Sequence, residues 1–129
     1  MGQNKSESPT GFIKQSLSWF YNTQITATAD PLIKFTIPVG CTPLSLRMNG
    51  TFDFTTTDED YTLSMEDDTT KISTDGTAIS ATGYVCQEAT FAAGTHIAKD
   101  SVLEIIITIG TSTTPTIDKL VIQFDYIED

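Results

Sequence analysis

The sequence is short of the residues that catalysis and metal binding use most. It has one histidine, His96, and two cysteines, Cys41 and Cys86, in 129 residues. It contains no G-x-S-x-G elbow, phosphate-binding loop or H-E-x-x-H motif, which are the familiar hydrolase, nucleotide and zinc signatures. Because an enzyme needs a proton-transfer group or an activated nucleophile, we expect neither enzyme activity nor a bound cofactor or metal. We expect His96 to be exposed or half exposed at the start of a strand.

Positive charge is also scarce. Seven lysines and arginines stand against seventeen aspartates and glutamates, which gives a net charge of −10. Such a chain repels phosphate backbones and anionic lipid headgroups, so we expect no nucleic-acid partner and no membrane association. No apolar run approaches the roughly 18 residues of a transmembrane helix, and no leader peptide is recognisable. We therefore expect a soluble protein that no leader peptide exports.

The polar opening stretch, MGQNKSESPTG, has two interpretations. Met1-Gly2 followed by Ser6 fits the M-G-x-x-x-[ST] pattern for myristoylation. A single myristoyl chain binds membranes only marginally, and an acidic protein is repelled by anionic leaflets. We therefore expect residues 1–10 to form a flexible arm, followed by a single domain over residues 11–129.

The two cysteines give no sign of a disulfide framework. Cys41 and Cys86 are far apart in segments that have the pattern of strands. They lack both the dense spacing of a secreted disulfide scaffold and the paired spacing of a zinc site. We expect two reduced and mostly buried thiols.

Apolar and polar residues alternate with a period of two along almost the whole chain after the tenth residue. This is the pattern of half-buried strands. No window holds a helical period of 3.6 residues, and β-branched residues, which favour strands, are frequent throughout. With turn signals between the strands, the sequence predicts an all-β fold, an antiparallel β-sandwich or jelly roll of about 8–10 strands.

The alternation also predicts which side chains face the core. Gly50 falls on the apolar face of its segment, which indicates a bend or a place of close packing. Pro38 indicates the end of a strand or an edge strand. The expected core residues are Ile33, Phe35, Ile37, Val39, Leu44, Leu46, Met48, Phe52, Phe54, Tyr61, Leu63, Met65, Leu103, Ile105, Ile107 and Ile109.

Two segments carry more apolar residues than one face of a sheet can bury. Trp19, Phe20 and Tyr21 are consecutive, so in a strand either Phe20 or the other two must face away from the core. Val102 and Ile106 lie opposite the core side of their segment, which indicates a central strand covered on both faces or a subunit contact. All five are candidates for an interface with another subunit or a capsid. Core packing and ligand binding are the alternatives for the aromatic triplet.

Carboxylates cluster in residues 51–75, which hold eight acids and one lysine. The clusters DED and EDD lie at the two ends of YTLSM, roughly 17 Å apart in a strand and too distant to share one ion. Calcium takes six to eight oxygens, and one loop such as residues 66–69 would supply part of that set. We expect solvated acidic turns that keep a threonine-rich sheet soluble, with a calcium site as the alternative.

The closing segment, AAGTHIAKDSVLEIIITIG…TIDKLVIQFDYIED, resembles small structural proteins of tailed-bacteriophage virions. In those decoration or cement proteins and fibre-type jelly rolls, an I-x-x-G-D-x-L-x-I-type segment often begins such a strand, and Lys99-Asp100 stands here where Gly-Asp often does. The resemblance implies a β-sandwich that usually forms trimers. It carries over no functional residue.

These observations together predict a non-enzymatic virion structural protein. We expect a capsid decoration or cement protein that coats or stabilises a phage head as a homotrimer bound to the major capsid protein. An acidic surface suits the capsid exterior, which does not face DNA, and a threefold contact would cover the surplus apolar residues. A receptor-binding or fibre-head domain and a calcium-dependent carbohydrate-binding module are the alternatives.

Overall fold

A computed structural model describes residues 13–53, 61–75, 83–109 and 116–129. These residues form eight β-strands, so the predicted all-β fold is confirmed. No helix in this part of the chain could cross a bilayer. The expected flexible arm, residues 1–10, lies outside the described residues. The strands are β1 (Lys14–Tyr21), β2 (Ala29–Thr36), β3 (Cys41–Asp53), β4 (Tyr61–Asp67), β5 (Thr70–Lys71), β6 (Gly83–Ala89), β7 (Val102–Ile109) and β8 (Thr116–Glu128).

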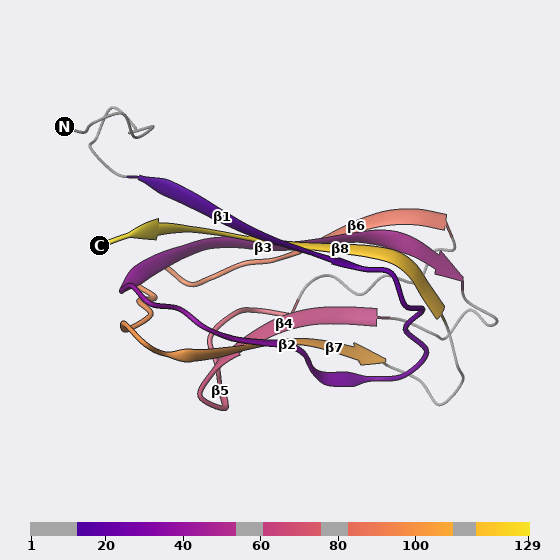
Figure 1. Ribbon diagram of the computed structural model, residues 1–129, viewed down its shortest axis with the longest axis horizontal. Coiled ribbons are helices and arrows are strands. Elements are labelled where there is room, and N and C mark those ends of the chain that lie inside the picture. Colours follow the sequence, from indigo (N-terminus) through magenta and orange to yellow (C-terminus); the bar gives the residue numbers. More distant parts are fainter. Residues whose placement is uncertain (1–12, 54–60, 76–82, 110–115) are drawn as a thin grey trace.

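The strands lie in two antiparallel sheets that pack face to face (Figure 1). One sheet has the order β1-β8-β3-β6 and the other the order β2-β7-β4-β5. The first strand thus lies beside the last, and most consecutive strands belong to opposite sheets. This is the arrangement of an eight-stranded jelly roll. The strand β2 lies at an edge and ends just before Pro38, in agreement with the sequence analysis.

Apolar side chains from every second position of the strands fill the space between the sheets. Phe52 and Tyr61 meet edge to face across it, with ring centroids 5.7 Å apart. Most of the predicted core is confirmed: Ile33, Ile37, Leu46, Met48, Phe52, Tyr61, Leu63, Met65, Leu103, Ile105 and Ile107 are buried. Phe35, Val39 and Ile109 are partly buried against the same cluster.

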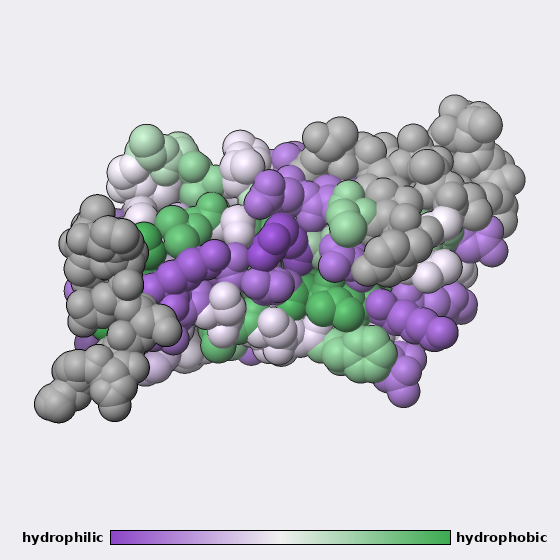
Figure 2. Space-filling view, turned by 90° about the horizontal axis from the view of Figure 1, so that it is seen from above, coloured by the Kyte–Doolittle hydropathy of each residue, from purple (hydrophilic) through white to green (hydrophobic). Residues whose placement is uncertain are grey.

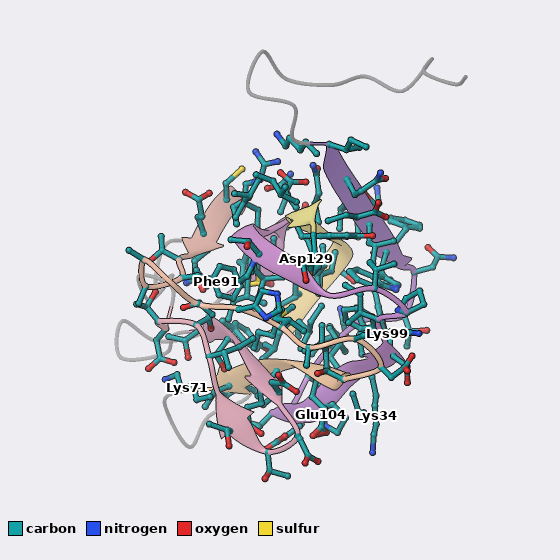
Figure 3. All side chains as sticks on the ribbon, turned by 90° about the vertical axis from the view of Figure 1, so that its left-hand side faces the viewer. Lys34, Lys71, Phe91, Lys99, Glu104 and Asp129 are labelled. Atoms are coloured by element: carbon teal, nitrogen blue, oxygen red, sulfur yellow. The ribbon has the colours of Figure 1, made fainter. Side chains whose placement is uncertain are left out.

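Polar side chains cover much of the two outer faces. On the outer face of the β1-β8-β3-β6 sheet, hydrophilic residues run across the middle, with hydrophobic patches beside them (Figure 2). On the other sheet, Lys34 of β2 lies directly opposite Glu104 of β7, and the two residues are neighbours in Figure 3. Each sheet therefore has one face that packs in the core and one outer face that is mainly polar, as antiparallel sheets commonly do.

The prediction that Leu44 is in the core is wrong: its side chain is 40% exposed. Where β3 pairs with β8, Pro43 lies opposite Tyr126 and Ser45 opposite Asp125, so Leu44 is an extra residue without a partner in the register. Such a β-bulge shifts the alternation by one position. Pro43 consequently points inward and is buried, while Leu44 points outward.

Gly50 lies opposite a second bulge, which is in β8: between the pairs Asn49–Val121 and Thr51–Asp118, β8 has one residue more than β3. A Cβ atom at Gly50 would lie 2.9 Å from the Cγ2 atom of Ile117, closer than side-chain carbons normally approach. The expectation of a bend or close packing at this glycine is therefore confirmed. Phe54, the next expected core residue, lies outside the described residues.

A buried glutamine joins the two sheets at the open side of β4. β4 pairs with β7 along its whole length, but with β5 only over its last two residues. From β6 in the other sheet, Gln87 accepts a hydrogen bond from the Leu63 N–H (2.7 Å) and donates one to the Tyr61 carbonyl (3.1 Å). The Ser73 hydroxyl accepts a third from the Met65 N–H (2.8 Å). These side chains replace the hydrogen bonds of a neighbouring strand.

We expect Gln87→Leu to lower the free energy of unfolding by about 2 kcal/mol, because two buried backbone groups of β4 lose these hydrogen bonds. Urea denaturation followed by the fluorescence of Trp19 would measure the loss. Gln24→Leu is the matched control, since exposed Gln24 binds the Asp118 carboxylate at the surface. The control should change stability by less than about 0.5 kcal/mol. Equal losses in both variants would contradict the role given to Gln87.

Candidate functional site

The outer face of the β1-β8-β3-β6 sheet carries three rows of side chains that run across the strands. Residues directly opposite one another in neighbouring strands lie about 5 Å apart on the same face. Read from β1 toward β6, the rows are Ser16–Asp125–Ser45, Ser18–Gln123–Arg47–Glu88 and Phe20–Val121–Asn49–Cys86. Strands distant in the sequence thus bring charged, amide, hydroxyl and apolar groups together on one surface.

Asp125 is the centre of the first row and is only 2% exposed. Hydroxyl, amide and cationic groups from β1, β8 and β3 surround its carboxylate. The distances are 2.5 Å to Ser16 Oγ, 3.3 Å to Ser45 Oγ, 2.9 Å to Gln123 Nε2, 3.1 Å to an Arg47 terminal nitrogen and 3.8 Å to Lys14 Nζ. We call these six residues the Asp125 cluster.

The cluster keeps the Asp125 carboxylate ionised. Burial alone would raise the pKa of Asp125, but hydrogen bonds from Ser16 and Gln123 and the charges of Lys14 and Arg47 outweigh it. The pKa therefore falls below its ordinary value of 3.8. At neutral pH the ionised carboxylate holds the Arg47 and Gln123 side chains in place.

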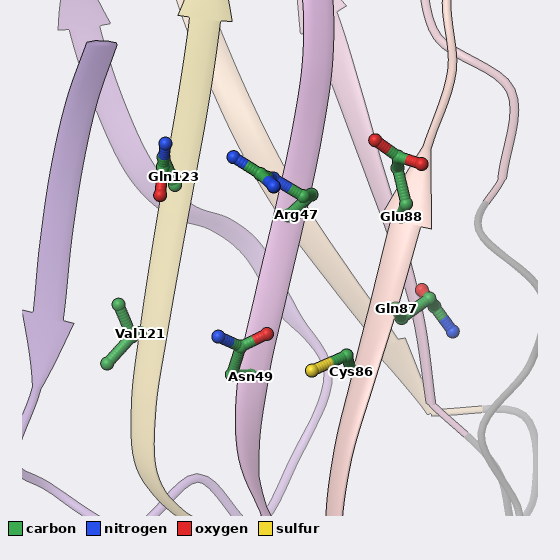
Figure 4. Close-up of a pocket in the computed structure, with 7 residues that line it drawn as sticks. All are labelled: Arg47, Asn49, Cys86, Gln87, Glu88, Val121 and Gln123. Carbon is green, nitrogen blue, oxygen red and sulfur yellow. The ribbon is translucent and has the colours of Figure 1, made fainter.

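A groove with a volume of about 400 Å³ lies beside the Asp125 cluster, over β8, β3 and β6 (Figure 4). This volume falls within the range of about 300–1,000 Å³ found for small-molecule sites. Gln87 contributes to the groove from β6, but its side chain points to the other side of the sheet and binds β4. The other lining residues are Arg47, Asn49, Cys86, Glu88, Val121 and Gln123.

The structure separates the three consecutive aromatic residues of β1. Trp19 faces the core, where its ring centroid lies 5.0 Å from that of Phe35. The Tyr21 hydroxyl donates a hydrogen bond to a backbone carbonyl of β2 at 2.8 Å. Phe20 points outward and is 61% exposed, beside Val121 of β8. Of the triplet, Phe20 is thus the residue whose side chain faces solvent.

The other two interface candidates lie on β7, which is central in its sheet. Ile106 is 5% exposed although it faces outward, and Val102 is partly buried. Ser64 of β4 lies opposite Ile106 on one side, and the register of β2 shifts between Ala29 and Ile33 on the other. Ile106 is therefore covered within the single chain.

The two cysteines are free thiols in different environments. Cys41 is buried; burial, followed by the nearby carboxylates of Asp129 and Glu128, raises its pKa to about 11. Cys86 is exposed in the groove, next in sequence to the inward-facing Gln87. The prediction of burial is therefore correct for Cys41 and wrong for Cys86, because alternation along β6 places Gln87 on its inner face.

The acidic segment forms a tight hairpin between β4 and β5. Asp68 and Thr69 both have positive φ angles, 49° and 72°, as in a type I′ turn. Within the described ranges, no group of three or more His, Cys, Asp or Glu residues could hold a metal ion. The cluster DED at residues 58–60 lies outside those ranges.

His96 is exposed, as the sequence analysis expects, but the prediction that it begins a strand is wrong. It lies between β6 and β7, where the next residue, Ile97, forms only an isolated bridge with Cys41. The Nε2 atom of His96 lies 2.9 Å and 2.8 Å from the two carboxylate oxygens of Asp129. Asp129 also donates its backbone N–H to the Gly40 carbonyl at 3.0 Å. These contacts join the segment between β6 and β7 to the residues that flank β8 and β3.

Comparisons with known proteins add little to this geometry. No family model matches the chain, and no curated protein matches it. A solved structure, the C-terminal domain of EclA, a sugar-binding protein, aligns with a TM-score of 0.39 and 15% sequence identity over 92% of this chain and 89% of that chain. A likeness at this level does not bear on function.

Replacing Asp125 with asparagine should lower the free energy of unfolding by about 2 kcal/mol at neutral pH, because charge-assisted hydrogen bonds are lost. The folded pKa of Asp125 lies below its unfolded value, so the carboxylate stabilises the fold at any pH above the unfolded pKa. This contribution disappears as pH falls through the folded pKa. The gap between wild type and Asp125→Asn should therefore shrink in acid. Urea denaturation at neutral pH and at about pH 3 would test this, and a constant gap would contradict it.

Ellman's reagent should modify one thiol in the native chain and two in the unfolded chain, since Cys41 is buried and Cys86 exposed. The thiolate is the reactive form, and the raised pKa of Cys41 keeps its thiol protonated at neutral pH. Absorbance during the reaction gives the count. Cys86→Ser should remove the native reaction, and rapid labelling of that variant would show that Cys41 is accessible.

Proposed function

We propose that this chain is a non-enzymatic structural protein of a virion exterior, a decoration or cement subunit that binds a major capsid protein and associates as a homotrimer. The observation that carries this proposal is the pair of exposed apolar side chains, Phe20 and Val121, on the outer face of the β1-β8-β3-β6 sheet. The jelly-roll fold, which also serves viral capsid proteins, and the resemblance of the closing segment support it.

Phe20 and Val121 lie directly opposite each other in β1 and β8 and are 61% and 36% exposed. Aromatic residues in such positions are frequent anchors of protein interfaces. β1 is an edge strand, so a second copy can approach Phe20 from the side of the sheet. A contact that joins this edge to a different surface of the next copy can close into a ring of three.

Local charge compensation favours the same surface for self-association. The whole chain carries a net charge of −10, which opposes contact between copies. On this face, however, the Asp125 carboxylate is buried and paired with Lys14 and Arg47. Copies that meet around Phe20 thus meet where negative charge is already offset.

The proposal of a non-enzymatic role is supported by where the reactive groups lie. His96 pairs with Asp129 at the surface. Ser16 donates its hydroxyl hydrogen to Asp125, whose lowered pKa makes it a weak base. A receptor-binding or fibre-head domain of the same kind of particle is the second candidate function, and the groove over β8, β3 and β6 is the observation that favours it.

Phe20→Ser should convert a trimer into monomers, because it removes the proposed anchor of the contact. Light scattering coupled to size-exclusion chromatography would give the mass of each species. Leu44→Ser is the matched control, since Leu44 is another exposed apolar side chain, 40% accessible, on the bulge of β3. The control should remain trimeric, and both variants should unfold at the wild-type urea concentration.

A wild-type protein that is monomeric and fails to bind its capsid would overturn the proposed function. The genes beside this one provide a separate check, because a decoration protein is expected next to a major capsid protein gene. Particles that keep their stability without this protein but lose binding to host cells would favour the receptor-binding candidate instead.

A further inference from the structure

The groove beside the Asp125 cluster has the hydrogen-bonding groups of a carbohydrate site. We propose that it binds a neutral sugar unit of a glycan through its own side chains, without calcium. This inference goes beyond the structural role proposed above and is tested separately from it.

Donor and acceptor groups alternate along one row of the groove. Arg47 lies directly between Gln123 of β8 and Glu88 of β6. A guanidinium only donates hydrogen bonds, a carboxylate only accepts them, and an amide does both. Side chains in such a row are about 5 Å apart, so neighbouring ones can bind neighbouring hydroxyl groups of a ring. Asn49, in the next row, adds a second amide.

Two of these side chains are held before any ligand arrives. Arg47 and Gln123 both donate to the buried Asp125 carboxylate, at 3.1 Å and 2.9 Å. Figure 4 shows the Arg47 guanidinium extending from β3 toward Gln123 on β8. Immobilising a free polar side chain on binding costs conformational entropy, and the Asp125 cluster reduces that cost in advance. The guanidinium has five N–H donors, enough to bind Asp125 and a ligand together.

The charges around the groove favour a neutral ligand. The positive charge of Arg47 is offset by Asp125, 3.1 Å away, and Glu88 lies opposite it in the register. A phosphate or carboxylate ligand would meet the Glu88 carboxylate and the field of a chain with a net charge of −10. Hydroxyl groups carry no charge and meet no such repulsion.

An apolar surface adjoins the polar row. Val121 lines the groove, and Phe20 continues the same row onto β1 with its side chain 61% exposed. Rows on one face are about 7 Å apart, two residues along a strand, so a ring bound to the Arg47 row can overlie the Val121 row. The C–H groups of a sugar ring can then pack on Val121 while its hydroxyls meet the polar side chains.

Calorimetry on the full chain would test the proposal. The probes are glucose, galactose, mannose, fucose and N-acetylglucosamine, with inorganic phosphate and sialic acid as anionic comparators, all in EDTA. We expect at least one neutral sugar to bind with a Kd of about 1 mM or tighter. No heat with any neutral sugar, binding of the anions alone, or binding that requires added calcium would each overturn it.

Variants locate the binding in the groove. Asn49→Ala and Glu88→Ala should each weaken binding at least about tenfold, because each removes hydrogen bonds to the ligand. Glu104→Ala is the matched control, since Glu104 lies on the other sheet. It should bind as wild type does, and urea denaturation would confirm that all three variants fold. Wild-type affinity in both groove variants would overturn the proposal.

Cys86 supplies an independent readout, because it lines the groove and is exposed. A saturating concentration of the bound sugar should slow its reaction with Ellman's reagent several-fold. An unchanged rate would place the sugar elsewhere and overturn the proposed site. A monomeric wild-type protein would count against the trimer but leave this protection intact, so failure of one proposal can be told from failure of the other.

Discussion

The alternation of side chains along β8 is the constraint on which both the core and the groove depend. β8 pairs with β1 and β3 over most of its length, and its inward residues, such as Phe124, lie in the centre of the core. Its outward residues are Val121, Gln123 and Asp125, which organise the outer face. A shift of its register by one residue would turn Asp125 into the core and Phe124 into water. The hydrophobic core therefore fixes the positions of the polar groups behind it.

Alternation along the sequence was sufficient to predict an all-β sandwich and most of its core, because one apolar face per strand is a local property. The position of Leu44 was not predictable in this way. Its orientation depends on a bulge that arises only where Pro43 and Ser45 pair with β8, far away in the sequence. For the same reason, alternation alone could not decide whether Phe20 or its neighbours would face outward.

The candidate site could not be predicted from the sequence, because its residues come from four strands that are far apart along the chain. Lys14 and Ser16 precede Asp125 by more than half the chain, and only the pairing of β1 with β8 brings them together. One signal was present: Asp125 stands between Phe124 and Tyr126, a charge inside a strongly apolar run. An aspartate is almost never buried without a polar or charged partner, so the sequence alone could have predicted a partner for Asp125.

The hydrogen bonds of Gln87 have a further consequence for contacts between copies of this chain in solution. An unprotected strand edge invites strands of other molecules to add to it, and this is a frequent route to aggregation. In β4, the Leu63 N–H and the Tyr61 carbonyl are engaged by a side chain of the same molecule. Strand addition at that position would first require the sandwich to open, so this part of β4 is closed to strands of other molecules.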